Sequence, residues 1–387
     1  MPSRADTTQR AELSKGSSPS FSGWQGRAMA TANHDLFGVA GTCASEGASF
    51  ARPEPAASDD TPAAVREVAS QVTHSLDLGL PVLIACDPSL EGVLAATGIT
   101  YLARAHEGEF RLVTNCHLQP RLGEEVVMAP STAEPGTVDF ARRVLEGFCR
   151  HVSARCTHLK PGKCPSSCSS VAVSRLVYAC ASDDPSMPQA VGRYLRLGFS
   201  VGPRVLEMIA DKRVAAFNDL ARSVVGECEH TRQFVRFSHM SDGSFIASFA
   251  PKADTIPLVA PHFAQRMGTE RFCLVDPSHL VAAFHEEGSR TCSIVRLDRE
   301  LAQSIGSRRD LADDELYVRA MWQRFYRGTT TPGRDRSQRG YDLRVSWMPK
   351  RFWAGLSELD ESLTGATPSV PERYQGSKRI AASSHSA

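Results

Sequence analysis

Residues 234–249 read Phe234-Val-Arg-Phe-Ser-His-Met-Ser-Asp-Gly-Ser-Phe-Ile-Ala-Ser-Phe249, and this stretch decides the fold class. Its two ends, 234–238 and 244–249, are rich in aromatic and β-branched residues, and Ser-Asp-Gly lies between them. An Asp-Gly pair between two such runs predicts a β-hairpin. The residues before this stretch have helical periodicity, so we expect the chain to change from helices to strands here.

The segments on either side of the hairpin complete the predicted fold. A helix at 258–267 and strands at 272–275 and 280–284 follow it, which gives the order strand, strand, helix, strand, strand. Apolar patterns elsewhere predict strands at 81–86 and 110–114 and helices at 138–152, 170–181, 314–327 and 349–359, with two further helical segments within 205–228. Because strands and helices come in blocks, we expect an α+β fold with a helical layer and an antiparallel ββαββ sheet region.

The two ends of the chain differ from its middle in composition. Residues 1–71 hold few large apolar side chains, and residues 362–387 are polar and small. Such segments bury too little apolar surface to offset the entropy of ordering them. We therefore expect disordered extensions at 1–71 and 362–387, with a single composite domain at 72–361. A targeting segment at the start of the chain is the alternative interpretation of its first residues.

Charge, length and cysteine content exclude several classes of protein. The 387 residues carry 44 Lys and Arg against 43 Asp and Glu, so the chain is neither polybasic nor acidic overall. Its apolar runs are too short for a membrane-spanning helix, which needs about 18 residues. Eleven cysteines in a chain of this size indicate reduced thiols and a cytoplasmic protein. The P-loop, Rossmann, zinc-protease and serine-hydrolase motifs do not occur in the sequence.

One group of cysteines raises the question of a metal. Four of them lie within twenty residues, at Cys149, Cys156, Cys164 and Cys168. Thiolates in such a group could hold zinc or an iron–sulfur cluster. Their spacing matches no common metal motif, and Cys149 falls on a helix whose other residues look like core. We favour the alternative, ordinary buried or surface thiols, and predict no cofactor.

Two arginines lie where the helix before the hairpin ends. Arg232 and Arg236 could bind a phosphate or a carboxylate, because a planar guanidinium group presents two parallel N–H donors. Salt bridges to Glu229 or Asp242 explain the same spacing, and spacing alone slightly favours them.

Three residues are candidates for acid–base chemistry: Glu229, His262 and Asp276. His262 and Arg266 are four residues apart and share one face of the predicted helix, where His could exchange protons and Arg could bind an anion. Asp276 follows a strand, which is a usual position for a functional carboxylate and also for an ordinary turn residue. The sequence does not decide whether the protein is an enzyme.

The segment 319–353 is strongly basic. It holds nine Lys or Arg and two Asp, and aromatic residues are interleaved with them. Cations neutralise phosphates and aromatic rings stack on unpaired bases, so the segment predicts a nucleic-acid-binding surface. Its candidate phosphate-binding residues are Arg334, Arg336, Lys350 and Arg351. We expect Trp322 and Phe325 to point into the core and the arginines to point outward.

An ordered set of motifs resembles a domain-of-unknown-function family described as probable DNA metabolism proteins. The motifs are Asp87-Pro-Ser-Leu-Glu91-Gly92, 229–237, Pro251, His262-Phe-Ala-Gln-Arg266, Phe272-Cys-Leu-Val-Asp276, Trp322-Gln-Arg-Phe325-Tyr326, Arg334 and Met348-Pro-Lys-Arg-Phe-Trp353. The sequence departs from the family pattern at Pro88, His279 and Asp335-Arg336, and the cysteine-containing segment 149–168 is not part of that pattern.

The resemblance implies an intracellular role in DNA repair or modification. Family members are encoded beside a putative radical-SAM DNA repair protein, and some are fused to a uracil-DNA-glycosylase-like domain. We therefore predict a nucleic-acid-associated protein, with single-stranded or damaged DNA and a radical-SAM protein as expected partners and no membrane partner. Two hypotheses compete with this one. The first is an enzyme for a small anionic metabolite, with Arg236, His262 and Arg266 in one pocket; the second is a non-catalytic adaptor for a radical-SAM or glycosylase partner.

Overall fold

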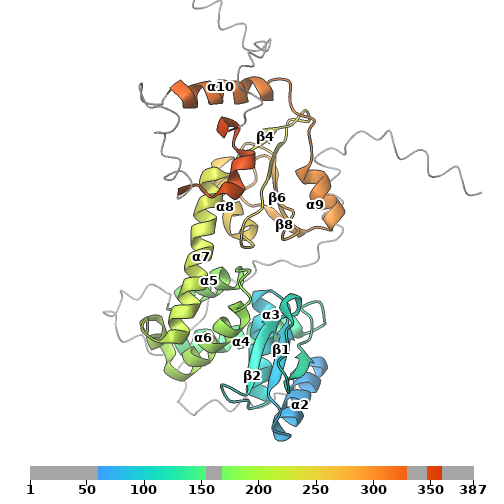
Figure 1. Cartoon of the computed structure of the whole chain (residues 1–387), viewed down its shortest axis with the longest axis vertical. Coiled ribbons are helices and arrows are strands. Elements are labelled where there is room, and N and C mark those ends of the chain that lie inside the picture. Colours follow the sequence, from blue (N-terminus) through green and yellow to red (C-terminus); the bar gives the residue numbers. More distant parts are fainter. Residues whose placement is uncertain (1–59, 154–167, 329–346, 360–387) are drawn as a thin grey trace, which may run out of the picture. The chain divides into compact units, whose positions relative to one another are not determined.

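The computed structural model describes residues 60–153, 168–328 and 347–359 (Figure 1). Helices and strands are both present in these ranges, and the α+β prediction is confirmed. Contacts divide the chain into two compact units, where we expected one composite domain. The parallel-sheet unit contains the described residues up to Cys228 together with 252–255. The mixed-sheet unit contains residues 229–251 and the described residues from Ile256 onward.

The parallel-sheet unit is built on three parallel strands in the order β2-β1-β3. The strands are β1 (Val82–Cys86), β2 (Phe110–Thr114) and β3 (Glu125–Met128). Every residue of β1 is buried, as is usual for a central parallel strand that is covered on both faces. β1 and β2 lie where the sequence predicts them. β3 was not predicted; Val126, Val127 and Met128 form a short apolar run there, but Val127 is the one buried residue of the strand.

Helices cover this sheet at close range. They are α2 (Ala63–Asp77), α3 (Leu90–Leu102), α4 (Thr137–Ser153), α5 (Cys168–Cys180), α6 (Met187–Val201) and most of α7 (Lys212–Phe234). Two glycines bring helices together: a Cβ at Gly98 would lie 2.7 Å from the Phe140 ring, and a Cβ at Gly198 would lie 2.4 Å from the Phe148 ring. The core therefore depends on the absence of a side chain at both positions.

The folded region begins earlier than predicted. α2 starts at Ala63, so the expected boundary between residues 71 and 72 falls inside a helix. Val65, Ala69 and Val72 are the buried apolar residues of this helix and recur at helical spacing. The prediction failed because small and polar residues surround these few apolar ones. Residues 1–59 and 360–387, which hold most of the expected extensions, lie outside the described residues.

The mixed-sheet unit contains a five-stranded sheet in the order β4-β5-β6-β7-β8. The strands are β4 (Ser238–His239), β5 (Phe245–Ser248), β6 (Phe272–Asp276), β7 (Val281–His285) and β8 (Ser293–Arg296). β4 and β5 form the predicted antiparallel hairpin, but β5 and β6 pair in parallel. The structure thus corrects the predicted antiparallel arrangement for this pair, because α8 (Ile256–Arg266) acts as a crossover connection.

Two helices cover opposite faces of the mixed sheet (Figure 1). α9 (Arg299–Gly306) packs Ile305 against the face that contains Cys273. α8 lies on the other face, because its Phe263 and the strand residue Phe272 both contact Phe237. Neighbouring strand residues such as 272 and 273 point to opposite faces, which is why the two helices are separated by the sheet.

The chain enters and leaves the mixed sheet through helical segments. α7 continues to Phe234, whose ring centroid lies 6.0 Å from that of Phe352, so the predicted strand at 234–238 shrinks to the two residues of β4. α10 (Glu315–Gly328) and the 3₁₀ segments η4 (Lys350–Gly355) and η5 (Ser357–Leu359) follow the sheet. Among the helices described, none combines the length and apolar character that crossing a membrane requires.

Candidate functional site

A cavity of about 300 Å³ lies in the mixed-sheet unit. Its walls come from the β4–β5 edge of the sheet, the end of α9 and the loop after it, α10, and the turn between η4 and η5. The polar lining residues are Arg236, Ser238, Ser248, Arg308, Arg309, Arg319 and Ser357. Arginines and serines thus face the cavity, and no carboxylate from the described residues lines it.

Carboxylates outside the lining hold two of the arginines. Glu358 accepts a hydrogen bond from Arg236 Nη2 at 3.0 Å, and Glu315 accepts one from Arg319 Nε at 2.7 Å. Both carboxylates are buried. Charge-assisted hydrogen bonds of this kind restrict the rotamers of the guanidinium groups, so two sides of the cavity are ordered before any ligand binds.

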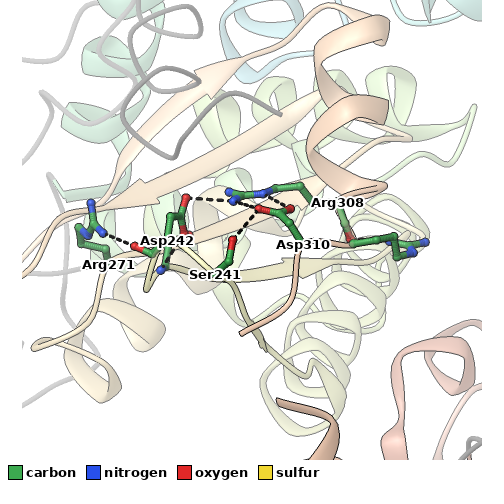
Figure 2. A network of polar contacts seen from close by, with 7 residues as sticks. Ser241, Asp242, Arg271, Arg308 and Asp310 are labelled. Atoms are coloured by element: carbon green, nitrogen blue, oxygen red, sulfur yellow. Dashed lines mark hydrogen bonds and ion pairs between the residues drawn. The ribbon is translucent and has the colours of Figure 1, made fainter. Parts of the chain in front are cut away.

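Arg308 is the most buried of the four arginines, and its side chain is 3% exposed. Figure 2 shows it between two carboxylates: Nη2 donates to Asp242 at 3.0 Å, and Nε donates to Asp310 at 2.7 Å. The Ser241 hydroxyl also donates to Asp310, and Arg271 donates to the backbone oxygen of Asp242. Hydrogen bonds from Arg308 lower the pKa of Asp310, although burial opposes that effect. The network therefore keeps the carboxylate of Asp310 and the guanidinium of Arg308 charged near neutral pH.

Arg309 differs from the other three arginines. It is exposed, its Nη1 donates to the backbone oxygen of Arg308 at 2.8 Å, and it forms no ion pair with a described residue. The hydroxyls of Ser248 and Ser357 likewise form no hydrogen bond within the described part of the chain. A ligand in the cavity can accept hydrogen bonds from these three side chains without breaking an ion pair or a contact to another side chain of the described residues.

The outer face of α10 exposes two aromatic rings. Trp322 is 42% exposed and Phe325 is 61% exposed, and their rings stack with centroids 5.6 Å apart. The expectation that both rings point into the core is therefore wrong. The positions of α10 that are buried after its first turn are Ala320 and Gln323, so a small residue and an amide occupy the inner side of the helix. We call Trp322 and Phe325 the aromatic face of α10.

A single carboxylate connects the aromatic face with the cavity. Trp322 Nε1 donates to Glu358 Oε2 at 3.1 Å, and Glu358 Oε1 accepts from Arg236, which lines the cavity. Arg319, one turn before Trp322 on α10, also lines the cavity. The aromatic face and the arginine-lined cavity are therefore linked through one buried carboxylate.

The three acid–base candidates lie on three different elements. Glu229 is exposed on α7 and forms an ion pair with Arg232 in the next turn. His262 is a half-buried residue of α8, on the sheet face opposite α9. Asp276 ends β6, is fully buried and accepts hydrogen bonds from the turn that follows, including one from the His279 ring. None of these three described residues lines the cavity.

The predicted anion-binding residues are also spread over the unit. Arg236 lines the cavity, whereas Arg232 is paired with Glu229 and Arg266 is exposed in the last turn of α8. The pocket that the metabolite hypothesis expected from Arg236, His262 and Arg266 is therefore not the cavity found here.

The basic segment holds four further phosphate-binding candidates. Lys350 and Arg351 begin η4, and the Arg351 guanidinium carbon lies 5.1 Å from the centroid of the Phe352 ring. Arg334 and Arg336 lie outside the described residues.

The cysteine group can be traced at two of its four positions. Cys149 packs against the core of the parallel-sheet unit from α4, and Cys168 is buried at the start of α5. Cys156 and Cys164 lie outside the described residues. Within 60–153, 168–328 and 347–359, no group of three or more metal-ligating side chains occurs. A zinc or iron–sulfur site in this group stays a low-ranked prediction.

Sequence analysis missed the most buried part of the site. Arg308 and Arg309 come two and three residues after the end of α9 at Gly306, and Asp310 comes next in the chain. Two adjacent arginines before an aspartate, at the end of a helix, are the signal that could have drawn attention to them. The contact between Arg308 and Asp242 could not be predicted from the sequence, because the two residues are 66 positions apart.

The Asp87–Gly92 motif has a structural explanation in the parallel-sheet unit. Asp87 follows β1 and accepts hydrogen bonds from Asn115, after β2, and from Thr132, after β3. Ser89 caps α3 by accepting from the Gly92 N–H at 3.0 Å. A Cβ on Gly92 would lie 2.4 Å from the backbone oxygen of Asp87, so this position requires glycine.

The cavity falls inside a region that matches a family model. The model is described as a domain of unknown function, DUF4130, and it matches residues 185–358. No curated protein and no solved structure matches the chain significantly. The match agrees with the expected domain of unknown function and carries no activity with it. The cavity and the aromatic face of α10 thus lie together in the region that resembles DUF4130.

Proposed function

We propose that the mixed-sheet unit binds single-stranded nucleic acid. The observation that carries the proposal is the exposed, stacked pair of Trp322 and Phe325 beside a cavity lined by arginines. Stacking of a base on an exposed ring contributes about 1–3 kcal/mol, and it works with every base because each has a π-face. Arginines next to the rings supply the contacts to phosphate.

A single strand suits the site better than a duplex does. The bases of a duplex are already stacked on each other, so their faces are closed to the rings of α10. An unpaired strand leaves its bases free to turn toward the protein while its phosphates follow the basic residues. The composition of 319–353, with nine basic and two acidic residues, supports the same class of ligand.

The resemblance to probable DNA metabolism proteins narrows the proposal further. It makes single-stranded or damaged DNA the expected ligand and a radical-SAM DNA repair protein the expected partner. We propose a cytoplasmic location, because eleven cysteines in a chain of this size suit a reducing compartment.

Fluorescence anisotropy with a labelled single strand and the matching duplex tests the proposal. The full-length protein should bind the single strand more tightly. Phe325→Ala should weaken that binding roughly tenfold, the loss expected for one stacked base. The matched control is Arg222→Ala, which removes an exposed arginine of α7 in the parallel-sheet unit and should leave affinity unchanged.

A salt titration tests the phosphate contacts. Arg334→Ala combined with Arg336→Ala should reduce the slope of log affinity against log salt by about 1.4, if each arginine neutralises one phosphate of a single strand. No binding at low salt, or binding that neither Phe325→Ala nor the double variant changes, would rule out the proposed function.

A protein partner is the second candidate for the aromatic face of α10. The same helix exposes Leu316, Val318 and Met321, and exposed apolar side chains in a group are typical of protein interfaces. A protein partner would leave the arginine-lined cavity unexplained, so we rank it second. Binding of a purified radical-SAM DNA repair protein that Met321→Ser abolishes, in a protein that binds no oligonucleotide, would favour this adaptor role.

A further inference from the structure

We propose that the arginine-lined cavity binds one unstacked nucleotide. Its phosphate is held by Arg309, Ser248 and Ser357, and its base or sugar lies on the apolar part of the lining. The inference rests on the proposed function, which supplies the class of ligand. It adds the place where a strand is held and the length of strand, one nucleotide, that enters the cavity.

The distribution of charge selects an anion. Among the described residues, the four lining arginines face no carboxylate inside the cavity, and the carboxylates that pair with three of them lie outside the lining. Arg309 forms no ion pair within the described residues, so its positive charge is the one that a ligand can neutralise. A neutral ligand in the cavity would cover the Arg309 guanidinium and leave its positive charge unpaired, which is unfavourable.

The donors for a phosphate are of two kinds. Arg236 and Arg319 are fixed by Glu358 and Glu315, so they offer an ordered wall. Arg309 and the hydroxyls of Ser248 and Ser357 have no side-chain partner among the described residues and can turn toward a ligand. A phosphate has several acceptor oxygens and can use both kinds at once.

The rest of the lining is apolar and suits the remainder of a nucleotide. Met240, Ile246, Ile305 and Leu356 are buried residues that line the same cavity. A small inorganic anion has no use for this surface, whereas a base or a deoxyribose ring can cover it. The volume of about 300 Å³ lies at the small end of the range for ligand pockets, which limits the occupant to one nucleotide.

The cavity also opens where the topology favours a ligand. Ser248 is the last residue of β5, which pairs in parallel with β6, and ligands of parallel sheets bind at the carboxyl ends of the strands. Gly306 adjoins the hydroxyl: a Cβ at this position would lie 2.8 Å from Ser248 Oγ. Glycine at the end of α9 therefore keeps the Ser248 side of the cavity open.

Isothermal titration of the full-length protein tests the inference, with deoxyadenosine monophosphate, deoxyadenosine and inorganic phosphate as probes. The monophosphate should bind at least roughly tenfold more tightly than either fragment, because each fragment uses one part of the lining. Arg309→Ala and Gly306→Ala should each weaken it by roughly tenfold. Arg299→Ala, an exposed arginine of α9 outside the lining, is the matched control and should have no effect.

Oligonucleotides with a 5′-phosphate or a 5′-hydroxyl distinguish the source of the nucleotide. Tighter binding of the phosphorylated strand identifies a strand end, and equal binding identifies an internal nucleotide; both agree with the inference when Arg309→Ala weakens them. Monophosphate binding that is absent at millimolar concentration, or that neither variant changes, overturns the inference. If Phe325-dependent binding of strands persists in that case, the proposed function stands. Monophosphate binding without strand binding overturns the proposed function alone.

Discussion

The two sheets of the protein place similar polar residues at their strand ends and use them differently. In the parallel-sheet unit, the carboxylate of Asp87 is surrounded by donors from the segments after β2 and β3. In the mixed-sheet unit, the polar residues around β4 and β5 line a cavity, and Ser248 at the end of β5 forms no hydrogen bond to a described residue. The first set closes the end of its sheet, and the second leaves its end open to a ligand.

The contrast between the two strand ends indicates where the carboxylates of an anion-binding site should lie. Asp87 is the acceptor that its neighbours converge on, so burial, which would raise its pKa, is outweighed by hydrogen bonds that lower it. Glu358, Glu315 and Asp310 instead hold arginines from outside the cavity and leave its interior to the cations. Residue type alone does not separate the two cases, because each uses carboxylates with hydrogen-bond donors.

The largest expected effect comes from removing the cation of the buried network. Arg308→Met takes away the charge between Asp242 and Asp310 and should destabilise the mixed-sheet unit by about 3 kcal/mol. Urea unfolding followed by tryptophan fluorescence measures this, because the tryptophans in the described ranges all belong to that unit. Arg213→Met, which removes a surface arginine paired with Asp211 in the other unit, should cost less than about 1 kcal/mol. Equal effects of the two variants would contradict the contrast between the units.

The next largest expected effect is a loss of stability from a substitution next to Asp87, at the end of the parallel sheet. Gly92→Ala forces a methyl group to within 2.4 Å of the Asp87 backbone oxygen, so α3 must shift. We expect a loss of about 2–3 kcal/mol, measured by far-ultraviolet circular dichroism during urea unfolding. Nucleotide binding by the cavity should survive at concentrations of urea where the protein is folded. A variant as stable as the natural protein would show that the close contact is not needed.

The two units should also respond to acid through different carboxylates. Hydrogen bonding to Arg111 lowers the pKa of Glu124 from 4.5 to about 2, so this contact contributes stability above pH 4.5 that is lost as the pH falls toward 2. Hydrogen bonding to Arg308 lowers the pKa of Asp310 from 3.8. This contact therefore contributes stability above pH 3.8 that is lost only as the pH falls below that value. Glu124→Gln should flatten the acid response seen by circular dichroism, and Asp310→Asn the one seen by tryptophan fluorescence. If Glu124→Gln changed the fluorescence response and Asp310→Asn the circular dichroism response, the assignment of one carboxylate to each unit would be contradicted.

The smallest expected effect is a gain. Gly226 lies inside α7, and a Cβ there would meet nothing within 4 Å. Gly226→Ala should stabilise the helix by about 0.5–1 kcal/mol, because alanine loses less backbone freedom on folding than glycine. Thermal unfolding measures the gain. A loss of stability instead would mean that this glycine, like Gly92, faces a close neighbour.

The sequence predicted elements with a strong local signal and missed those that depend on distant partners. The sequence predicted β1, β6 and β7 from their buried apolar runs. It predicted α4, α5, α8 and α10 from apolar residues at helical spacing. α9 and β8 were missed, although Leu301, Ala302 and Ile305 of α9 are buried in the core. The direction of β5 relative to β6 was missed as well, because a crossover helix and an excursion within an antiparallel sheet have the same local pattern.

The site shows the same division. Arg236 was identified from its position after a helix, and the interleaved aromatics of α10 were identified from composition. The exposure of Trp322 was missed because its hydrogen-bond partner, Glu358, is 36 residues away and draws the indole to the side of the helix. Arg308 was missed for a similar reason, since its burial depends on Asp242 in the hairpin turn.

The close approach of α6 to β2 bears on how this protein can be divided. A Cβ at Gly192 would lie 2.6 Å from Leu112, so α6 rests directly on the strand. The region that matches DUF4130 begins at residue 185 and therefore includes α6 but leaves out β2. A fragment cut at that boundary would carry one half of a packed interface and expose Val191 and Leu195 to water. The region that resembles the family model thus begins inside the parallel-sheet unit and does not coincide with a complete packed unit of this chain.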